Sequence, residues 1–138
     1  MTTIAVKDDC MACDSMVSGG FTQATRKIRK ANNCIVGYAG DWLAGEYFAD
    51  YYLSSREEKP ERDSDDDIEL LVLKKSGIYL VDYRFREVRI CGKHYAIGSG
   101  AQGAMVAMNM GATAPEAVKE AIKVDDYTSG KVRSLRLG

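Results

Sequence analysis

The sequence predicts an α+β fold in which helices cover the outer faces of two stacked antiparallel sheets. The expected strands come in groups before and after a single helix, whereas a doubly wound parallel sheet would alternate strands singly with helices. Short turns join neighbouring strands, as in the segment Lys74-Lys75-Ser76-Gly77, which is typical of antiparallel hairpins. The chain has 138 residues, of which 46% are hydrophobic. This length favours a single domain over residues 1–138, with a core that needs no disulfide or metal.

The first half of the chain is expected to form four strands and one helix. Turn signals at Asp8-Asp9, Gly19-Gly20 and Asn32-Asn33 bound the strands. The expected strands cover residues 2–6, 10–14, 26–30 and 34–38. Asp41 is the expected N-cap of a helix over residues 42–56, because aromatic residues there recur every three or four positions. Residues 57–67 contain a proline and three consecutive aspartates, which predicts a solvated loop.

The second half is expected to add more strands and two consecutive helices. The strand-like segments are residues 68–73, 77–81, 88–91, 95–97 and 131–137. A helix rich in Ala and Met is expected over residues 99–110, with Gly111 at its C-terminal end. The segment from Thr113 to Glu116 fits a capping box with a proline in the first turn, which predicts a helix that runs to about Asp125.

Composition and charge exclude several classes of function. Lys and Arg number 19 and Asp and Glu number 20, so the net charge is -1 and nothing indicates a nucleic-acid partner. No apolar run is long enough to span a bilayer. The first nine residues lack the basic and apolar regions of a signal peptide. The four cysteines are therefore expected to be reduced thiols rather than a disulfide framework, and the expected location is cytoplasmic.

Two motifs suggest chemistry that their context does not support. The run from Gly98 to Gly103 matches G-x-G-x-x-G, but a dinucleotide site needs a second parallel strand that ends in an acidic residue, and here another helix follows. We interpret these glycines as positions that let a helix pack closely on a sheet. The C-x-x-C of Cys10 and Cys13 lacks the second ligand pair that zinc prefers, and it lies within an expected strand. We interpret it as small apolar packing, and His94 as a surface or edge-strand residue.

Thr2 is the chemically notable position, because it follows an initiator methionine that is usually removed when the next residue is small. Removal would leave a threonine with a free α-amine. The hydroxyl of such a residue can attack a carbonyl, and its own amine, with an unperturbed pKa of about 7.7–8.0, can accept the proton.

Six short segments follow one another along nearly the whole chain. They are Thr2-Thr3-Ile4, Ala12-Cys13-Asp14-Ser15, Lys27-Ile28, Gly37-Tyr38-Ala39-Gly40, Tyr95-Ala96-Ile97-Gly98-Ser99-Gly100 and Asp126-Tyr127-Thr128-Ser129-Gly130. Together, and in this order, they resemble the proteasome β-type subunits, and most closely the bacterial HslV peptidases. The fifth segment resembles that family's strand-to-helix junction, so the resemblance also accounts for the glycine run without a nucleotide.

The resemblance implies a role for each matched polar residue. Thr2 would be the nucleophile and its α-amine the base, with Lys27 beside the hydroxyl and Asp14 paired with Lys27. The backbone N–H of Gly40 would donate to the oxyanion. The residues that would position the amine and a water are Ser99, Asp126 and Ser129.

Each of these residues also has a plain structural interpretation when it is taken alone. Lys27 lies in a run of five residues with four bases, which is typical of a solvated lysine, and Asp14 could simply end a hairpin. Ser99 could N-cap its helix, and Asp126 and Ser129 could cap a loop. The six segments in family order favour the catalytic interpretation.

The resemblance further implies a four-layer αββα sandwich of the N-terminal nucleophile hydrolase type, with a shortened helical layer where residues 57–67 replace a second helix. It implies stacked homo-oligomeric rings that degrade unfolded polypeptides, with an ATP-driven AAA+ unfoldase (HslU-like) as partner. No bound cofactor is expected. HslV peptidases hold a sodium-like cation through backbone carbonyls in the loop that corresponds to about residues 125–131, and carbonyl ligands leave no side-chain signature. The alternatives are a catalytically silent ring subunit and an N-terminal nucleophile amidase that acts on a small molecule.

Overall fold

The computed structural model describes residues 2–15, 27–54, 68–82 and 84–138. These residues form two antiparallel sheets and three helices, so the predicted α+β architecture is confirmed. The elements are β1 (Thr3–Lys7), β2 (Cys10–Cys13), β3 (Ile28–Ala31), β4 (Cys34–Gly40), α1 (Trp42–Leu53), β5 (Ile68–Lys74), β6 (Gly77–Val81), β7 (Glu87–Arg89), β8 (His94–Gly98), α2 (Ala101–Asn109), α3 (Ala114–Val124) and β9 (Arg133–Arg136). One sheet has the order β8-β1-β2-β9 and the other the order β3-β4-β5-β6-β7.

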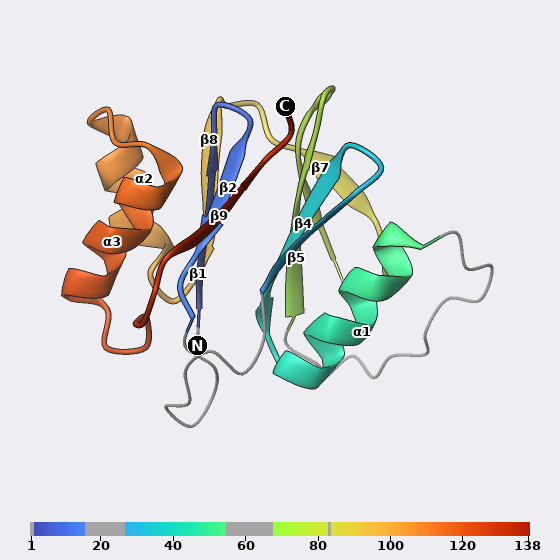
Figure 1. Ribbon diagram of the computed structural model, residues 1–138, viewed down its shortest axis with the longest axis horizontal. Coiled ribbons are helices and arrows are strands. Elements are labelled where there is room, and N and C mark those ends of the chain that lie inside the picture. Colours follow the sequence, from blue (N-terminus) through green and yellow to red (C-terminus); the bar gives the residue numbers. More distant parts are fainter. Residues whose placement is uncertain (1, 16–26, 55–67, 83) are drawn as a thin grey trace.

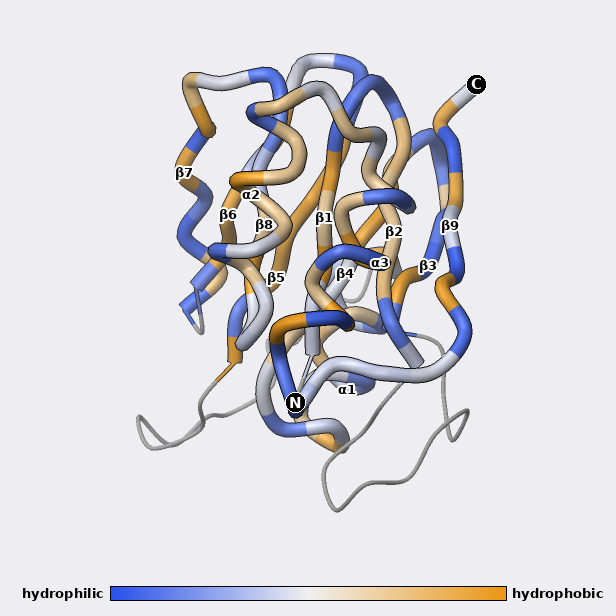
Figure 2. The backbone as a smooth tube through the Cα atoms, turned by 90° about the vertical axis from the view of Figure 1, so that its left-hand side faces the viewer, coloured by the Kyte–Doolittle hydropathy of each residue, from blue (hydrophilic) through white to orange (hydrophobic). Residues whose placement is uncertain are grey.

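The two sheets face each other, and the helices lie on their outer sides. Figure 1 shows α2 and α3 beyond the four-stranded sheet and α1 beyond the five-stranded sheet. Figure 2 shows hydrophobic residues along strands such as β1 and β6. In the described part of the chain, α1 is the one helix on its side. The expected acidic loop over residues 57–67 lies outside the described residues.

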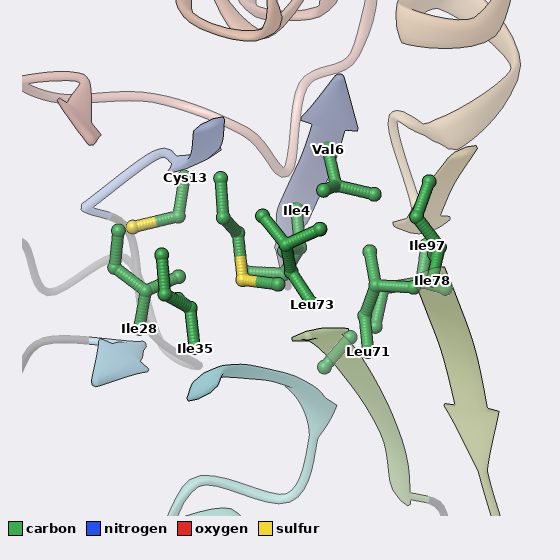
Figure 3. Close-up of a cluster of buried hydrophobic side chains, with 11 residues drawn as sticks. Ile4, Val6, Cys13, Ile28, Ile35, Leu71, Leu73, Ile78 and Ile97 are labelled. Atoms are coloured by element: carbon green, nitrogen blue, oxygen red, sulfur yellow. The ribbon is translucent and has the colours of Figure 1, made fainter. Parts of the chain in front are cut away.

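The core between the sheets consists of side chains that alternate toward the partner sheet, as strand geometry requires. Figure 3 shows Ile4, Val6 and Cys13 of the four-stranded sheet facing Ile35 and Leu71 of the other. Gly37 lets the sheets approach closely at this level. A Cβ atom on Gly37 would lie 2.8 Å from the Ile4 side chain and 2.9 Å from the Met11 sulfur.

Each outer face of the sandwich has its own apolar cluster against the helices. Small residues of the four-stranded sheet pack against α2 and α3, and larger residues of the five-stranded sheet pack against α1. A Cβ atom on Gly45 of α1 would lie 2.1 Å from the Tyr38 ring, so the helix backbone rests directly on that ring. This placement buries Phe48 but leaves Tyr47 55% exposed, so the expected aromatic stripe is only partly buried.

The helix starts follow the predicted capping signals. The Asp41 side chain accepts a hydrogen bond from the Ala44 N–H (2.8 Å) and caps α1. Thr113 and Glu116 form the predicted capping box of α3, since each side chain accepts from the other's backbone N–H. Ser99 does not cap α2; the N-cap position is Gly100, without a side-chain bond. The hydroxyl of Ser99 is therefore available for other contacts.

The C-x-x-C segment is divided between the two faces of β2. Cys10 packs in the cluster under α2 and α3, whereas Cys13 packs between the sheets. Burial raises the pKa of both thiols, that of Cys13 to about 12, so neither is a reactive thiolate at neutral pH. His94 begins the edge strand β8, and its Nε2 lies 2.6 Å from the Asn109 side-chain oxygen. Residues 2–15, 27–54, 68–82 and 84–138 contain no group of three metal-ligating side chains, and no helix among them is long and apolar enough to cross a membrane.

Candidate active site

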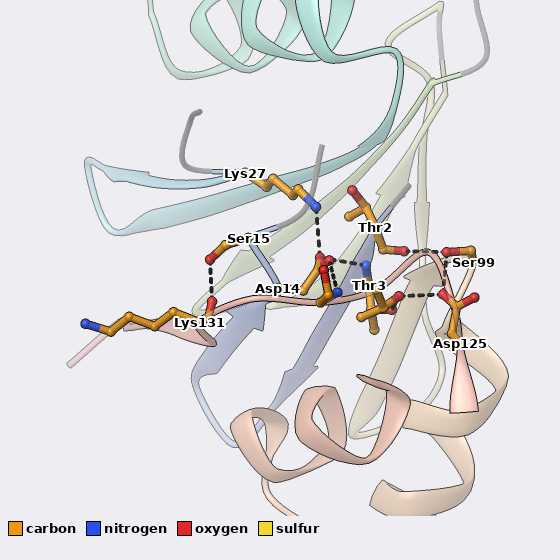
Figure 4. A network of polar contacts seen from close by, with 10 residues as sticks. Thr2, Thr3, Asp14, Ser15, Lys27, Ser99, Asp125 and Lys131 are labelled. Atoms are coloured by element: carbon orange, nitrogen blue, oxygen red, sulfur yellow. Dashed lines mark hydrogen bonds and ion pairs between the residues drawn. The ribbon is translucent and has the colours of Figure 1, made fainter. Parts of the chain in front are cut away.

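A cluster of buried polar side chains lies at one end of the sandwich, where strands of both sheets begin or end (Figure 4). The β1–β2 register pairs Ile4 with Cys13, which places Thr3 opposite Asp14 at the next position. Asp14 and Thr3 also bond through their backbones, since the Asp14 N–H donates to the Thr3 carbonyl (3.3 Å). Lys27 comes from the other sheet, just before β3, and its carbonyl accepts from the Tyr38 N–H (3.1 Å). The site is therefore assembled from both sheets.

Asp14 connects several members of this cluster. Its Oδ1 accepts hydrogen bonds from the Lys27 ammonium (2.9 Å) and from the Thr3 N–H (3.0 Å). Its Oδ2 accepts from the N–H of Ser129, in the loop between α3 and β9 (3.1 Å). The side chains of Lys27 and Asp14 are 2% and 0% exposed, so this is a buried ion pair. The predicted pairing of Lys27 with Asp14 is thus present in the structure.

Burial governs the electrostatics of Lys27. Removal of the ammonium from water lowers its pKa, and the charge and hydrogen bond of Asp14 oppose this effect without cancelling it. The result is a cation held in a dry environment, where its field on a neighbouring oxygen is screened little. A titratable group of this kind, whose pKa is shifted by burial and which has a specific charge partner, is typical of functional sites.

Thr2 lies beside this pair and is only 6% exposed. In Figure 4 its side chain points to the side on which the Lys27 ammonium lies. Its carbonyl oxygen lies 3.4 Å from Ser99 Oγ. The carbonyl also passes so close to Gly98 that a Cβ there would lie 1.9 Å from its oxygen. The backbone at Thr2 is therefore held between β8 and the polar cluster.

A chain of four side chains continues from Ser99 away from the ion pair; we call it the hydroxyl chain. The Ser99 hydroxyl donates to Asp125 Oδ2 (2.6 Å), and the Thr128 hydroxyl donates to the same oxygen. The Thr128 and Thr3 hydroxyl oxygens are 2.8 Å apart. The hydroxyl chain thus consists of Ser99, Asp125, Thr128 and Thr3, and both of its ends adjoin Thr2.

The glycines of the G-x-G-x-x-G run make room for these groups. A Cβ on Gly100 would lie 2.1 Å from the Thr3 hydroxyl oxygen and 3.1 Å from that of Thr128. A Cβ on Gly103 would lie 3.1 Å from a methyl of Val124, in α3. The run therefore serves close packing at the junction of β8 and α2, as interpreted from the sequence, except that Gly103 packs against α3 and not against the sheet.

The remaining residues suggested by the sequence fall in different places. Gly40 ends β4 with a positive φ of 116° and is exposed. Ser129 reaches the ion pair through its backbone N–H. Asp126 is exposed, and the carboxylate that Ser99 contacts belongs to Asp125.

Three residues of the site were not identified from the sequence: Thr3, Asp125 and Thr128. The spacing D-x-x-T of Asp125 and Thr128 precedes the spacing D-x-x-S of Asp126 and Ser129 by one residue. Both patterns offer a carboxylate and a hydroxyl three residues apart. The sequence alone therefore contained a usable signal, but the same pattern occurred twice, one residue apart.

The charge of Asp125 gives a prediction about acid stability. Burial alone would raise the pKa of this carboxyl, but hydrogen bonds from Ser99, Thr128 and the Tyr127 N–H lower it below the ordinary value of 3.8. A lowered folded-state pKa stabilises the fold above the ordinary value, and this stabilisation is lost as the pH falls through the lowered pKa. In thermal unfolding between about pH 6 and pH 2, Asp125→Asn should therefore lose less stability than the wild type.

Asp126→Asn is the matched control, because it makes the same change on the exposed neighbouring residue. It should follow the wild-type profile. Equal flattening of the profile by both substitutions would contradict the assignment of the effect to the hydroxyl chain.

Comparison with known proteins agrees with this geometry at the level of fold. No protein-family model and no curated protein matches the chain. Among solved structures, BPH from Thiobacillus denitrificans in complex with epoxomicin matches with a TM-score of 0.71 and 22% identity, covering 99% of this chain and 98% of that one. A second BPH structure from the same organism matches with a TM-score of 0.70 and 23% identity, with the same coverage. Eukaryotic HslV from Trypanosoma brucei matches with a TM-score of 0.71 and 16% identity, covering 98% of each chain. Over nearly its full length, the chain therefore has the proteasome β-type fold of the BPH and HslV structures.

Proposed function

We propose that the chain is a threonine peptidase subunit whose nucleophile is Thr2. The observation that carries this proposal is the buried Lys27–Asp14 ion pair beside Thr2, since an ion pair is costly to bury and this one lies where strands of both sheets meet. The proposal requires removal of whatever precedes Thr2, because an acylated amine cannot act as a base.

In the proposed reaction the α-amine accepts the proton of the Thr2 hydroxyl as Oγ1 attacks the peptide carbonyl carbon. The positive charge of Lys27 stabilises the developing negative charge on Oγ1, and the Gly40 N–H donates to the oxyanion. The C–N bond then breaks, and the protonated amine returns its proton to the leaving nitrogen. Water hydrolyses the remaining ester and regenerates Thr2.

The hydroxyl chain has a place in this scheme. Because the proton of the Ser99 hydroxyl is directed to Asp125, the lone pairs of the Ser99 oxygen remain available as acceptors. A free α-amine on Thr2 could donate to them, because the Thr2 main chain lies beside Ser99. This arrangement would orient the amine toward the hydroxyl of its own residue, which supports the role of Thr2 as both nucleophile and base.

The wider assembly belongs to the same proposal. We expect stacked rings of this subunit that degrade unfolded polypeptides delivered by an ATP-driven unfoldase, located in the cytoplasm. Exposed apolar side chains on α1 and at the C-terminal end of α2 support assembly, because Leu43 is 74% and Met110 85% exposed in the single chain. The fold shared with HslV is consistent with such rings.

The test uses a peptide epoxyketone such as epoxomicin, which the BPH structure contains. This warhead forms its ring adduct only with a hydroxyl and a free amine on one residue. Intact-mass spectrometry of the purified protein should show loss of Met1 followed by one adduct per chain. Thr2→Ala should be processed in the same way and form no adduct, with an unchanged circular dichroism spectrum.

Other outcomes separate the alternatives. A processed wild type without an adduct would favour a silent ring subunit or a small-molecule amidase. An adduct together with hydrolysis of small amides, but not of casein-like chains even with an unfoldase present, would favour a small-molecule amidase. If Thr2→Ala formed the adduct as fast as the wild type, the proposal would be wrong.

A further inference from the structure

We infer that the Thr3 hydroxyl is a positioning group for Thr2, because it closes a ring of polar contacts that runs from the Thr2 carbonyl through the hydroxyl chain and back to the main chain at Thr3. This inference rests on the proposed function and adds a residue to it. Thr3 is 0% exposed and pairs with Gly98 in the β1–β8 register, so its hydroxyl is held at the junction of β8 and α2.

The direction of each bond in this ring follows from the chemistry of Asp125. A carboxylate only accepts hydrogen bonds, so the Ser99 and Thr128 hydroxyls must both donate to it. Thr128 has a single hydroxyl proton, which is thereby used. The 2.8 Å contact between Thr128 and Thr3 therefore requires the Thr3 hydroxyl to donate.

This order of donation gives the Thr3 hydroxyl a specific effect on Thr2. The donor bond from Thr3 holds the Thr128 oxygen, and Thr128 in turn holds the Asp125 carboxylate that accepts from Ser99. Ser99 Oγ is thereby held 3.4 Å from the Thr2 carbonyl oxygen, with its proton directed to Asp125. Loss of the Thr3 hydroxyl would free Thr128 to rotate and would loosen the orientation of the remaining members.

The space around Thr3 is fitted to this hydroxyl. Gly100 leaves open the volume that the Thr3 and Thr128 oxygens occupy, since a Cβ there would lie 2.1 Å from the first and 3.1 Å from the second. The alternative is that the Thr3 hydroxyl only completes local hydrogen bonding. In that case Thr3→Val would change the stability of the fold and not the rate of adduct formation.

The experiment compares the wild type, Thr3→Val and Thr3→Ser in their reaction with a peptide epoxyketone, followed by intact mass. Valine keeps the shape of threonine without the hydroxyl, whereas serine keeps the hydroxyl. Thr3→Val should lower the maximal rate of adduct formation by about three- to tenfold, as expected for one neutral hydrogen bond, with little change in the concentration at half-maximal rate. Thr3→Ser should restore most of the rate.

The outcomes distinguish this inference from the proposed function. A wild type that forms no adduct overturns both. A wild type that reacts, with Thr3→Val reacting at the same maximal rate, overturns only the positioning role. An equal loss in Thr3→Val and Thr3→Ser also overturns it, because the hydroxyl would then not be the cause.

A second variant guards against poor folding of Thr3→Val. Thr128→Val removes the hydroxyl that links Thr3 to Asp125 and should lower the maximal rate at least as much as Thr3→Val does. The double variant should be no slower than Thr128→Val alone, because both substitutions interrupt one chain. Additive losses would contradict the ring.

Discussion

Replacement of Lys27 by methionine is expected to lower the free energy of unfolding by about 3–5 kcal/mol, because it removes one partner of a buried ion pair and leaves the other charge without compensation. The Lys27 and Asp14 side chains are both almost fully excluded from solvent and are 2.9 Å apart. The same substitution should lower the rate of epoxyketone adduct formation by about 100-fold or more, since the cation beside the Thr2 hydroxyl is lost.

The remaining partners of Asp14 explain why the loss should be large. Its carboxylate also accepts the N–H groups of Thr3 and Ser129, so Asp14 cannot turn away toward water without leaving buried donors unsatisfied. For the same reason, a simultaneous change of Asp14 to an apolar residue should not restore stability, although such exchanges succeed for isolated pairs.

Lys30→Met is the matched control, because Lys30 lies on β3 three residues further along and is exposed. Its ammonium contacts the carbonyls of Arg136 and Leu137 at the surface, and its loss should cost less than about 1 kcal/mol. Urea unfolding of both variants measures the difference. Equal stability losses would show that burial of the pair is not the cause.

Gly98→Ala is expected to destabilise the protein by at least about 3 kcal/mol, from two additive causes. The backbone at Gly98 has a φ of 98°, which an L-residue with a side chain rarely adopts. The added methyl would also lie 1.9 Å from the Thr2 carbonyl oxygen, a distance that no rotamer can relieve because both atoms are fixed to backbone. The Thr2 backbone would have to move, and adduct formation should fall with it.

Gly111→Ala separates these two causes. Gly111 has a similar φ of 106°, but a Cβ there meets no atom within 4 Å. This variant should therefore show only the backbone cost, about 1 kcal/mol, and should react with the epoxyketone as the wild type does. A Gly98→Ala variant no less stable than Gly111→Ala would contradict the close approach of Thr2 to β8.

The order and type of the elements could be predicted from the sequence because their signals are local. Asp41 and the Thr113 capping box mark helix starts through contacts within three residues. The α1 surface could not be predicted as well, because its rotation depends on Gly45 resting on a ring of the neighbouring strand. Periodicity alone does not record which side of a helix meets the sheet.

The contacts of the site were also predictable only in part. The Lys27–Asp14 pair was expected from family-like segments, and the structure brings these residues together. The place of Thr3 in the cluster could not be predicted, because its hydroxyl meets a residue 125 positions away in the chain. The choice between Asp125 and Asp126 depends on how the chain leaves α3, where Asp125 is the C-cap, and two adjacent aspartates give no local signal for it.

Lys27 comes from one sheet and Asp14 from the other. The geometry of the proposed reaction therefore depends on how the two sheets dock. The distance between the ammonium and Thr2 is set by how the sheets slide and separate, and Gly37 fixes that spacing at the centre of the sandwich. We therefore expect a substitution deep in the apolar layer to change the rate of epoxyketone adduct formation without any contact with Thr2 or Lys27.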